Sequence, residues 1–161
     1  MALNDFVVNN PRPLPVILLC DTSGSMSVDG KIEALNQAVK QMVATFAGES
    51  RIRAEIQVGL ITFGQGVNEH LPLTAAKDIA DVSPMQATGP TPLGEALNRT
   101  RILLENKAVI PSRAYRPVIV LVSDGYATDD WETPLEALNR SERASKASRF
   151  AMAIGQDADR I

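Results

Sequence analysis

The sequence of 161 residues contains a single cysteine, Cys20, and a single histidine, His70. With one cysteine no internal disulfide can form, so nothing in the sequence indicates an oxidising compartment. One histidine also leaves the chain without the histidine and cysteine cluster typical of a zinc site, and we expect His70 to be an exposed polar residue. Other side chains therefore carry the chemistry of this protein.

The sequence also lacks a surplus of positive charge and any long apolar run. It has 16 lysine and arginine residues against 19 aspartate and glutamate residues, a net charge of −3, so nucleic acid is not an expected partner. No apolar stretch reaches the roughly 20 residues that cross a bilayer, and residues 1–15 lack the basic and apolar segments of an export signal. We therefore expect a cytoplasmic protein with no membrane partner.

What the sequence does contain is typical of one globular domain, with 45% apolar and 22% charged residues. Short apolar runs alternate with segments whose apolar residues recur at three and four positions. They predict strands at 14–20, 54–63, 67–71, 118–122 and 150–154, and helices at 31–47, 90–104 and 133–148. This alternation favours a doubly wound, Rossmann-like α/β fold, a three-layer sandwich around a mainly parallel sheet. The hairpin at Gly64-Gln65-Gly66 makes 67–71 an antiparallel edge strand.

Two of the predicted strands, 14–20 and 118–122, run directly into short polar segments. These segments are Asp21-Thr22-Ser23-Gly24-Ser25 and Ser123-Asp124-Gly125. If the two strands are parallel neighbours, their carboxyl ends meet at one edge, where open α/β sheets bind ligands. We then expect four side chains in one crevice: Asp21, Ser23, Ser25 and Asp124.

The predicted cluster offers only oxygen ligands, which suits a hard divalent cation. Magnesium is the expected ion, and manganese or calcium are alternatives because ligand type alone separates hard cations poorly. Serine hydroxyls are neutral, so they leave the charge of the cation poorly neutralised. Such a centre favours the capture of a carboxylate from outside.

The pattern resembles the metal-ion-dependent adhesion site of the von Willebrand factor A domain, which joins an Asp-x-Ser-x-Ser loop to a distant Thr and a distant Asp. Asp21, Ser23 and Ser25 match the loop, Thr91 in Gly89-Pro90-Thr91-Pro92-Leu93 matches the Thr, and Asp124 matches the last position. The resemblance implies that these five residues hold a divalent cation whose open position takes a Glu or Asp of a protein partner. Pro90 replaces a glycine common in the family, which predicts a stiffer second loop.

Within that family the sequence is most similar to the cytoplasmic bacterial TerY-type group linked to tellurite resistance, through segments that include Ile61-Thr62-Phe63 and Asp129-Asp130-Trp131. This similarity implies an adaptor in stress-response signalling, with a kinase and phosphatase system as possible partners. The family usually continues into a further helix and strand, so we expect 1–161 to be one domain without them.

Three residues beyond Asp124, namely Asp129, Asp130 and Trp131, are a predicted rim around the cation. Trp131 would serve as a contact anchor of the kind found at the centres of interfaces. The alternative is a solvated loop with a half-buried tryptophan.

Two other functions remain open. A metal-dependent phosphohydrolase would use Asp21 as nucleophile, but it would want a second carboxylate two residues later, where Ser23 stands. A serine hydrolase lacks the flanking glycines, and only His70 could be its base. The second open function is that of a subunit coupled to an AAA+ ATPase. We expect a binding module and not an enzyme.

Overall fold

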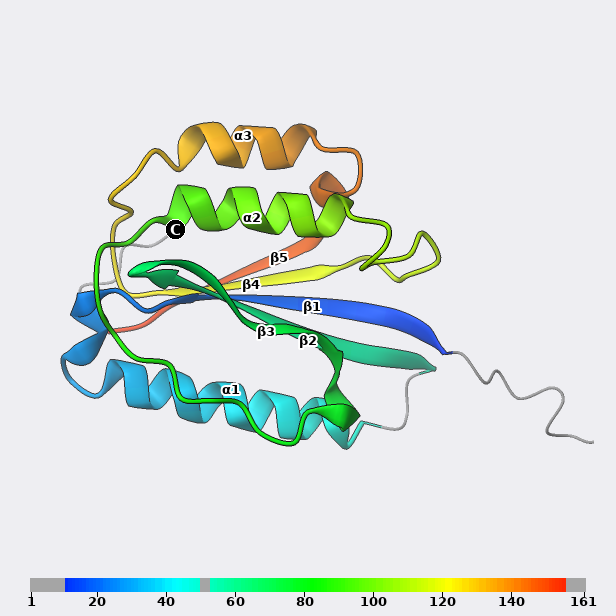
Figure 1. Cartoon of the computed structure of the whole chain (residues 1–161), viewed down its shortest axis with the longest axis horizontal. Coiled ribbons are helices and arrows are strands. Elements are labelled where there is room, and N and C mark those ends of the chain that lie inside the picture. Colours follow the sequence, from blue (N-terminus) through cyan, green and yellow to red (C-terminus); the bar gives the residue numbers. More distant parts are fainter. Residues whose placement is uncertain (1–10, 50–52, 156–161) are drawn as a thin grey trace, which may run out of the picture.

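A computed structural model describes residues 11–49 and 53–155 as one sheet of five strands between two layers of helices (Figure 1). The strands are β1 (Arg12–Asp21), β2 (Ala54–Gly64), β3 (Gly66–Ala75), β4 (Val118–Ser123) and β5 (Ser148–Ala153). The helices are α1 (Lys31–Ala47), α2 (Leu93–Glu105) and α3 (Glu132–Arg140). Short 3-10 turns occupy Gly24–Ser27, Ala76–Asp78 and Ala144–Lys146.

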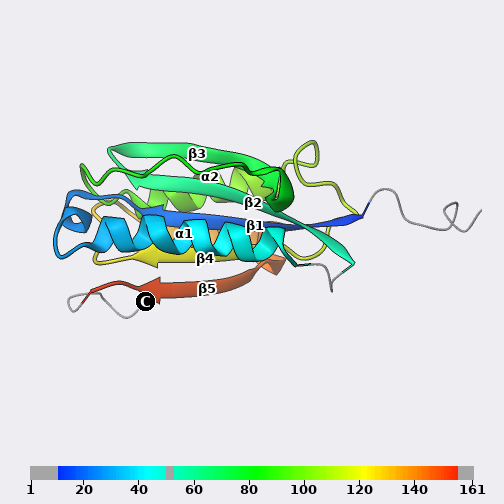
Figure 2. The same ribbon diagram turned by 90° about the horizontal axis from the view of Figure 1, so that it is seen from below.

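The strand order is β3-β2-β1-β4-β5, which Figure 2 shows from the α1 side. β1 pairs in parallel with β2 and β4, β5 pairs in parallel with β4, and β3 is the antiparallel edge. α1 covers one face of the sheet and α2 and α3 cover the other (Figure 1). The predicted three-layer, mainly parallel fold with one antiparallel edge strand is therefore confirmed.

The central strand β1 divides the core between the two helical layers. Leu18 and Cys20 belong to the cluster under α1, whereas Ile17 and Leu19 belong to the cluster under α2 and α3. All four side chains are buried. Burial raises the pKa of the Cys20 thiol to about 12, so this residue serves as a small apolar core side chain and not as a reactive thiolate.

Two prolines lie inside β1 even though a proline removes a donor from the sheet. The carbonyl of Pro13 accepts a hydrogen bond from the Tyr115 backbone N–H at 2.8 Å, on the side of β1 that pairs with β4 further along the strand. Residues two apart in a strand face the same neighbour, so Pro15 faces that side as well. Pairing with β4 begins only at Val16. The backbone N–H groups that the two prolines lack would therefore lie on a stretch of β1 that does not pair with β4.

Two predicted helix boundaries are wrong, because the helix expected from residue 90 begins at Leu93 and the helix expected at 133–148 ends early. The helix expected at 133–148 ends at Arg140, and Ser141 has an extended backbone. The Glu105 carboxylate accepts hydrogen bonds from the backbone N–H groups of Arg143 and Ala144, each at 2.8 Å. This contact with α2 fixes a 3-10 turn in place of further α-helix, and β5 consequently begins at Ser148.

The chain leaves β1 and β4 in opposite directions, because α1 leads to β2 whereas α3 leads to β5. Loops that diverge from neighbouring parallel strands leave a crevice between them, the usual ligand position in this fold class. In the described ranges, no helix is both long and apolar enough to span a bilayer. The expectation about a missing C-terminal strand and helix concerns positions after residue 155, which lie outside the described residues.

Candidate metal centre

Asp21, the last residue of β1, lies at the carboxyl end of the strand and is fully buried. Its Oδ1 accepts a hydrogen bond from the Ser23 backbone at 2.8 Å, and its Oδ2 accepts one from the Ser123 hydroxyl at 2.7 Å. Ser123 ends β4, so the carboxylate is fixed between the two strands. Burial raises the pKa of Asp21, and the hydrogen bonds from Ser23 and Ser123 oppose that rise only in part.

A continuous chain of hydrogen bonds joins three more of the predicted residues. The Ser23 and Ser25 hydroxyl oxygens lie 3.0 Å apart, and the Ser25 hydroxyl donates to Asp124 Oδ1 at 3.0 Å. Ser25 and Asp124 are 99 positions apart in the sequence. Ser23 and Asp124 are buried, whereas Ser25 is exposed. The cluster therefore runs from a buried carboxylate to the molecular surface.

Thr91, the fifth predicted residue, is held at the same edge by backbone contacts of its loop. The Gly24 N–H donates to the Gly89 carbonyl at 2.9 Å, which joins the first loop to the second. The Thr91 N–H donates to the Thr128 hydroxyl at 3.0 Å, and the Thr128 N–H donates back to the Thr91 carbonyl at 2.9 Å. These bonds connect three loops that are distant in sequence. Thr128 was missed by sequence reasoning, because no local pattern distinguishes it.

Glycine is required at position 89 of the second loop. Its φ of +86° favours glycine, and a Cβ there would lie 2.7 Å from the backbone nitrogen of Gln65. The loop that carries Thr91 thus packs closely against the β2–β3 hairpin.

Two of the three predicted rim residues bind the amino ends of helices through their carboxylates. Asp129 accepts backbone hydrogen bonds from Gly94 at 2.9 Å and Glu95 at 3.0 Å, and so caps α2 from another segment. Asp130 accepts from the N–H groups of residues 132 and 133 and caps α3. Both carboxylates therefore have structural partners. Trp131 is 39% exposed, and Tyr126, which sequence reasoning missed, is 73% exposed.

Lys31, the first residue of α1, also contacts the cluster and was missed as well. Its Nζ lies 3.2 Å from Asp124 Oδ2. Burial pushes the pKa of Asp124 upward, but hydrogen bonds from Ser25 and Lys31 outweigh that effect, so the pKa lies below the ordinary value for an aspartate. The two carboxylates of the cluster are thus shifted in opposite directions.

The donor set fits a hard divalent cation of the magnesium type. It contains two carboxylates together with neutral hydroxyls, and magnesium in proteins usually takes only one or two carboxylates. Among residues 11–49 and 53–155, no three His, Cys, Asp or Glu side chains gather into a metal-binding group. A cation at this edge would therefore depend on the seryl and threonyl oxygens.

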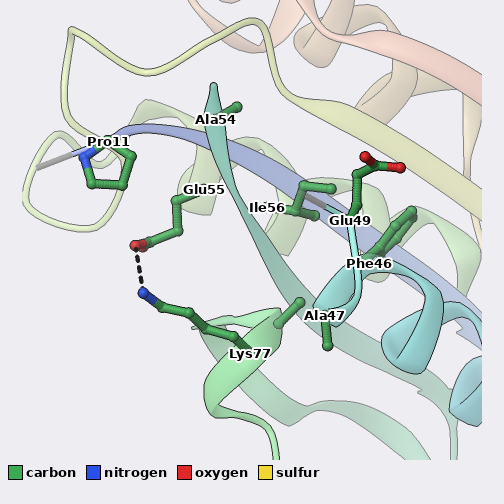
Figure 3. A pocket seen from close by; sticks show the side chains of 9 residues that line it. Pro11, Phe46, Ala47, Glu49, Ala54, Glu55, Ile56 and Lys77 are labelled. Carbon is green, nitrogen blue, oxygen red and sulfur yellow. Dashed lines mark ion pairs between the residues drawn. The ribbon is translucent and has the colours of Figure 1, made fainter. Parts of the chain in front are cut away.

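Two other parts of the described structure are weaker candidates for a functional site. A pocket of about 130 Å³ lies at the far end of α1, where Glu55 and Lys77 pair with each other at 3.9 Å beside the apolar Phe46 and Ile56 (Figure 3). His70 is half-buried, and its Nε2 lies 2.6 Å from the Ser83 carbonyl oxygen. The prediction that His70 is simply exposed is wrong, because the segment before α2 covers it.

Sequence comparison identifies one matching family. The sequence model of the von Willebrand factor type A domain matches residues 16–160, which include β1 from Val16 onward, all of β4 and all five predicted ligands. No match was found among curated proteins.

Solved structures share the fold at low sequence identity. The manganese-loaded TRAP protein of Plasmodium vivax has a TM-score of 0.70 at 20% identity, over 92% of this chain and 59% of that one. Proximal thread matrix protein 1 of the mussel byssus gives 0.67 at 24%, over 91% and 39%. The pilus adhesin SpaC of Lactobacillus rhamnosus GG, in its open conformation, gives 0.60 at 23%, over 74% and 16%. The chain thus spans less than two thirds of each of these proteins.

Proposed function

Because the chain belongs to the von Willebrand factor type A domain family, we propose that it is a protein-binding module that captures an acidic side chain through a divalent cation. The observation that carries this proposal is the contact of Ser25 with both Ser23 and Asp124 at 3.0 Å. It joins the ends of two strands into one oxygen-lined site. A bound cation would supply the positive charge that attracts a carboxylate.

The proposed ligands are Asp21, Ser23, Ser25, Thr91 and Asp124, acting as a metal-ion-dependent adhesion site. Magnesium is the proposed ion, with manganese and calcium as alternatives. The exposed Ser25 gives the partner its access, and Trp131 and Tyr126 are exposed on the loop after Asp124. The proposed partner residue is a Glu or Asp, whose carboxylate would complete the coordination.

The site favours binding over turnover. A phosphohydrolase would need the Asp21 carboxylate free to attack a substrate. In this protein both of its oxygens accept hydrogen bonds and the side chain is fully buried. Ser23, in the position where a second carboxylate would be wanted, bonds to Ser25 instead. We therefore propose that the protein is not an enzyme.

The biological setting is proposed from sequence resemblance. Similarity to the TerY-type group supports a cytoplasmic adaptor in a bacterial stress response, with a kinase and phosphatase system among the candidate partners. Coupling to an AAA+ ATPase is the alternative setting. In either setting the partner would bind at the proposed cation-dependent surface.

Calorimetric titration of the metal-free protein with magnesium tests the proposal. We expect one binding event per chain, and we expect Asp124→Ala to abolish it because the substitution removes a carboxylate and the acceptor of Ser25. Asp81→Ala is the matched control, since the Asp81 side chain is 77% exposed and pairs with Lys40 at 4.0 Å. Uptake that is equal in wild type and Asp124→Ala would contradict the proposal.

A further inference from the structure

Lys31 occupies a position that is locally unfavourable for a lysine. It is the first residue of α1, and the amino end of a helix carries partial positive charge, which favours acids and disfavours cations. Its side chain is only 13% exposed, and burying an ammonium group costs free energy unless the group is paired. A residue that violates a local preference in this way points to compensation by tertiary contacts.

The compensating contact is with the candidate metal centre. Lys31 Nζ lies 3.2 Å from Asp124 Oδ2, and the Asp124 side chain is only 2% exposed. The other oxygen of that carboxylate accepts the hydrogen bond from Ser25. Asp124 is therefore held by the lysine on one side and by a proposed cation ligand on the other.

The fold also provides room for the lysine side chain. Gly155, just after β5, has a φ of +88°, and a Cβ at this position would lie 2.8 Å from Lys31 Cε and 3.3 Å from Nζ. A larger residue there would push the ammonium away from Asp124. Three segments fix this charge at the centre: the first turn of α1, the loop after β4 and the segment after β5 that contains Gly155.

The charges of the centre do not cancel when a divalent cation binds. Carboxylates that hold a metal are ionised, so Asp21 and Asp124 contribute −2, and Lys31 reduces the sum to −1. A divalent cation would then leave the loaded centre at +1 and not at zero. We infer that Lys31 keeps the loaded centre net positive, which weakens the binding of the divalent cation and strengthens the capture of a partner carboxylate. This inference rests on the proposed function.

The first measurement is magnesium affinity by calorimetry in Lys31→Met, which keeps the side-chain length and removes the charge. We expect the dissociation constant to fall roughly tenfold, because the substitution removes a like charge that repels a divalent cation at short range. Lys31→Arg should stay close to wild type. Lys40→Met is the control, since Lys40 lies on the same helix with a side chain that is 50% exposed.

The second measurement is carboxylate affinity, with acetate as the probe. Manganese at saturating concentration relaxes the acetate methyl protons when acetate binds at the metal, and the titration gives an apparent affinity. We expect this affinity to fall several-fold in Lys31→Met and to be retained in Lys31→Arg. The two affinities thus change in opposite directions.

Opposite shifts distinguish the inference from a purely structural role. If Lys31 only held the loop in place, both affinities would fall in Lys31→Met, and this result would overturn the inference, as would two unchanged affinities. Lys31→Gln repeats the test if the methionine variant does not fold. A wild-type protein that takes up no magnesium would overturn the proposed function itself, whereas normal uptake with an unaffected Lys31→Met would overturn only the inference.

Discussion

At the scale of single residues, the two aspartates of the centre have opposite effects on stability. Burial raises the pKa of Asp21, so the metal-free folded protein holds a proton there more tightly than the unfolded chain does. The net lowering of the pKa of Asp124 means that folding favours its ionised form. The metal-free protein thus carries one carboxylate that disfavours folding when ionised and one that favours it.

We predict that Asp21→Asn stabilises the metal-free protein and abolishes magnesium uptake. Asp21 stabilises the fold fully only below its unfolded pKa of about 3.9, and this stability is lost as the pH rises through the higher folded value. The free energy of unfolding of the variant should therefore match wild type at acid pH and exceed it by about 1 kcal/mol near pH 7. Urea denaturation in a chelator at several pH values measures the difference.

Asp124→Asn is the internal comparison for this prediction. In the wild type the Asp124 carboxylate stabilises the fold fully above its unfolded pKa, and this stabilisation is lost as the pH falls through the lower folded pKa. The variant should therefore be less stable than wild type near pH 7. It also loses the charge that pairs with Lys31. Destabilisation by both substitutions at neutral pH would contradict the assigned directions.

At the scale of secondary-structure elements, the amino end of α2 depends on a residue from another segment. Asp129 accepts the backbone N–H groups of Gly94 and Glu95, whereas the residue before α2, Pro92, makes no side-chain cap. In the same loop, the Thr128 hydroxyl accepts a hydrogen bond from the Thr91 N–H. The helix end and the second ligand loop are consequently stabilised together.

We predict that Asp129→Ala lowers the free energy of unfolding by about 1 kcal/mol, the usual effect of losing a helix cap. It should also weaken magnesium binding several-fold, because Thr91 lies two residues before α2. Thermal denaturation and calorimetry measure the two effects.

Asp130→Ala is the matched control for Asp129→Ala. The Asp130 carboxylate caps α3 through the N–H groups of residues 132 and 133, so its loss should lower stability and leave magnesium affinity unchanged. Equal magnesium affinities in wild type and Asp129→Ala would show that the cap does not position the second loop.

At the scale of the whole molecule, the candidate centre exists only in the folded chain. Ser23 and Ser25 precede Asp124 by about a hundred residues, and hydrogen bonds join them only because β1 and β4 are neighbours. A ligand that binds the folded state alone stabilises it by an amount that grows with its concentration. Cation binding and folding are therefore linked.

We predict that magnesium raises the melting temperature of the wild-type protein and not that of Asp124→Ala. At a free concentration one hundred times the dissociation constant, the gain is about 2.7 kcal/mol, which corresponds to several degrees for a domain of this size. Differential scanning fluorimetry with magnesium, compared with sodium chloride at equal ionic strength, separates specific binding from screening. An equal rise with both salts would argue against a specific site.

The sequence by itself determined the layers of the fold and the edge at which the candidate residues gather. Apolar runs at 14–20 and 118–122 are buried strands because they are apolar on both faces, and such strands in an alternating α/β pattern are parallel neighbours. The polar residues that follow them necessarily share one edge. Asp21, Ser23, Ser25 and Asp124 could therefore be placed together from local pattern alone.

Only the tertiary structure decided how that edge is supported. Lys31 meets Asp124 across 93 positions, and Ser123 meets Asp21 across 102. Asp129 caps a helix that begins more than thirty positions earlier. Glu105 binds the backbone of the turn that follows α3, at a similar separation in the sequence. These contacts follow no period and no motif, because they depend on which loops meet once the sheet has formed. A local pattern records the face that a residue turns to the core, whereas the partner of a charge depends on the whole chain.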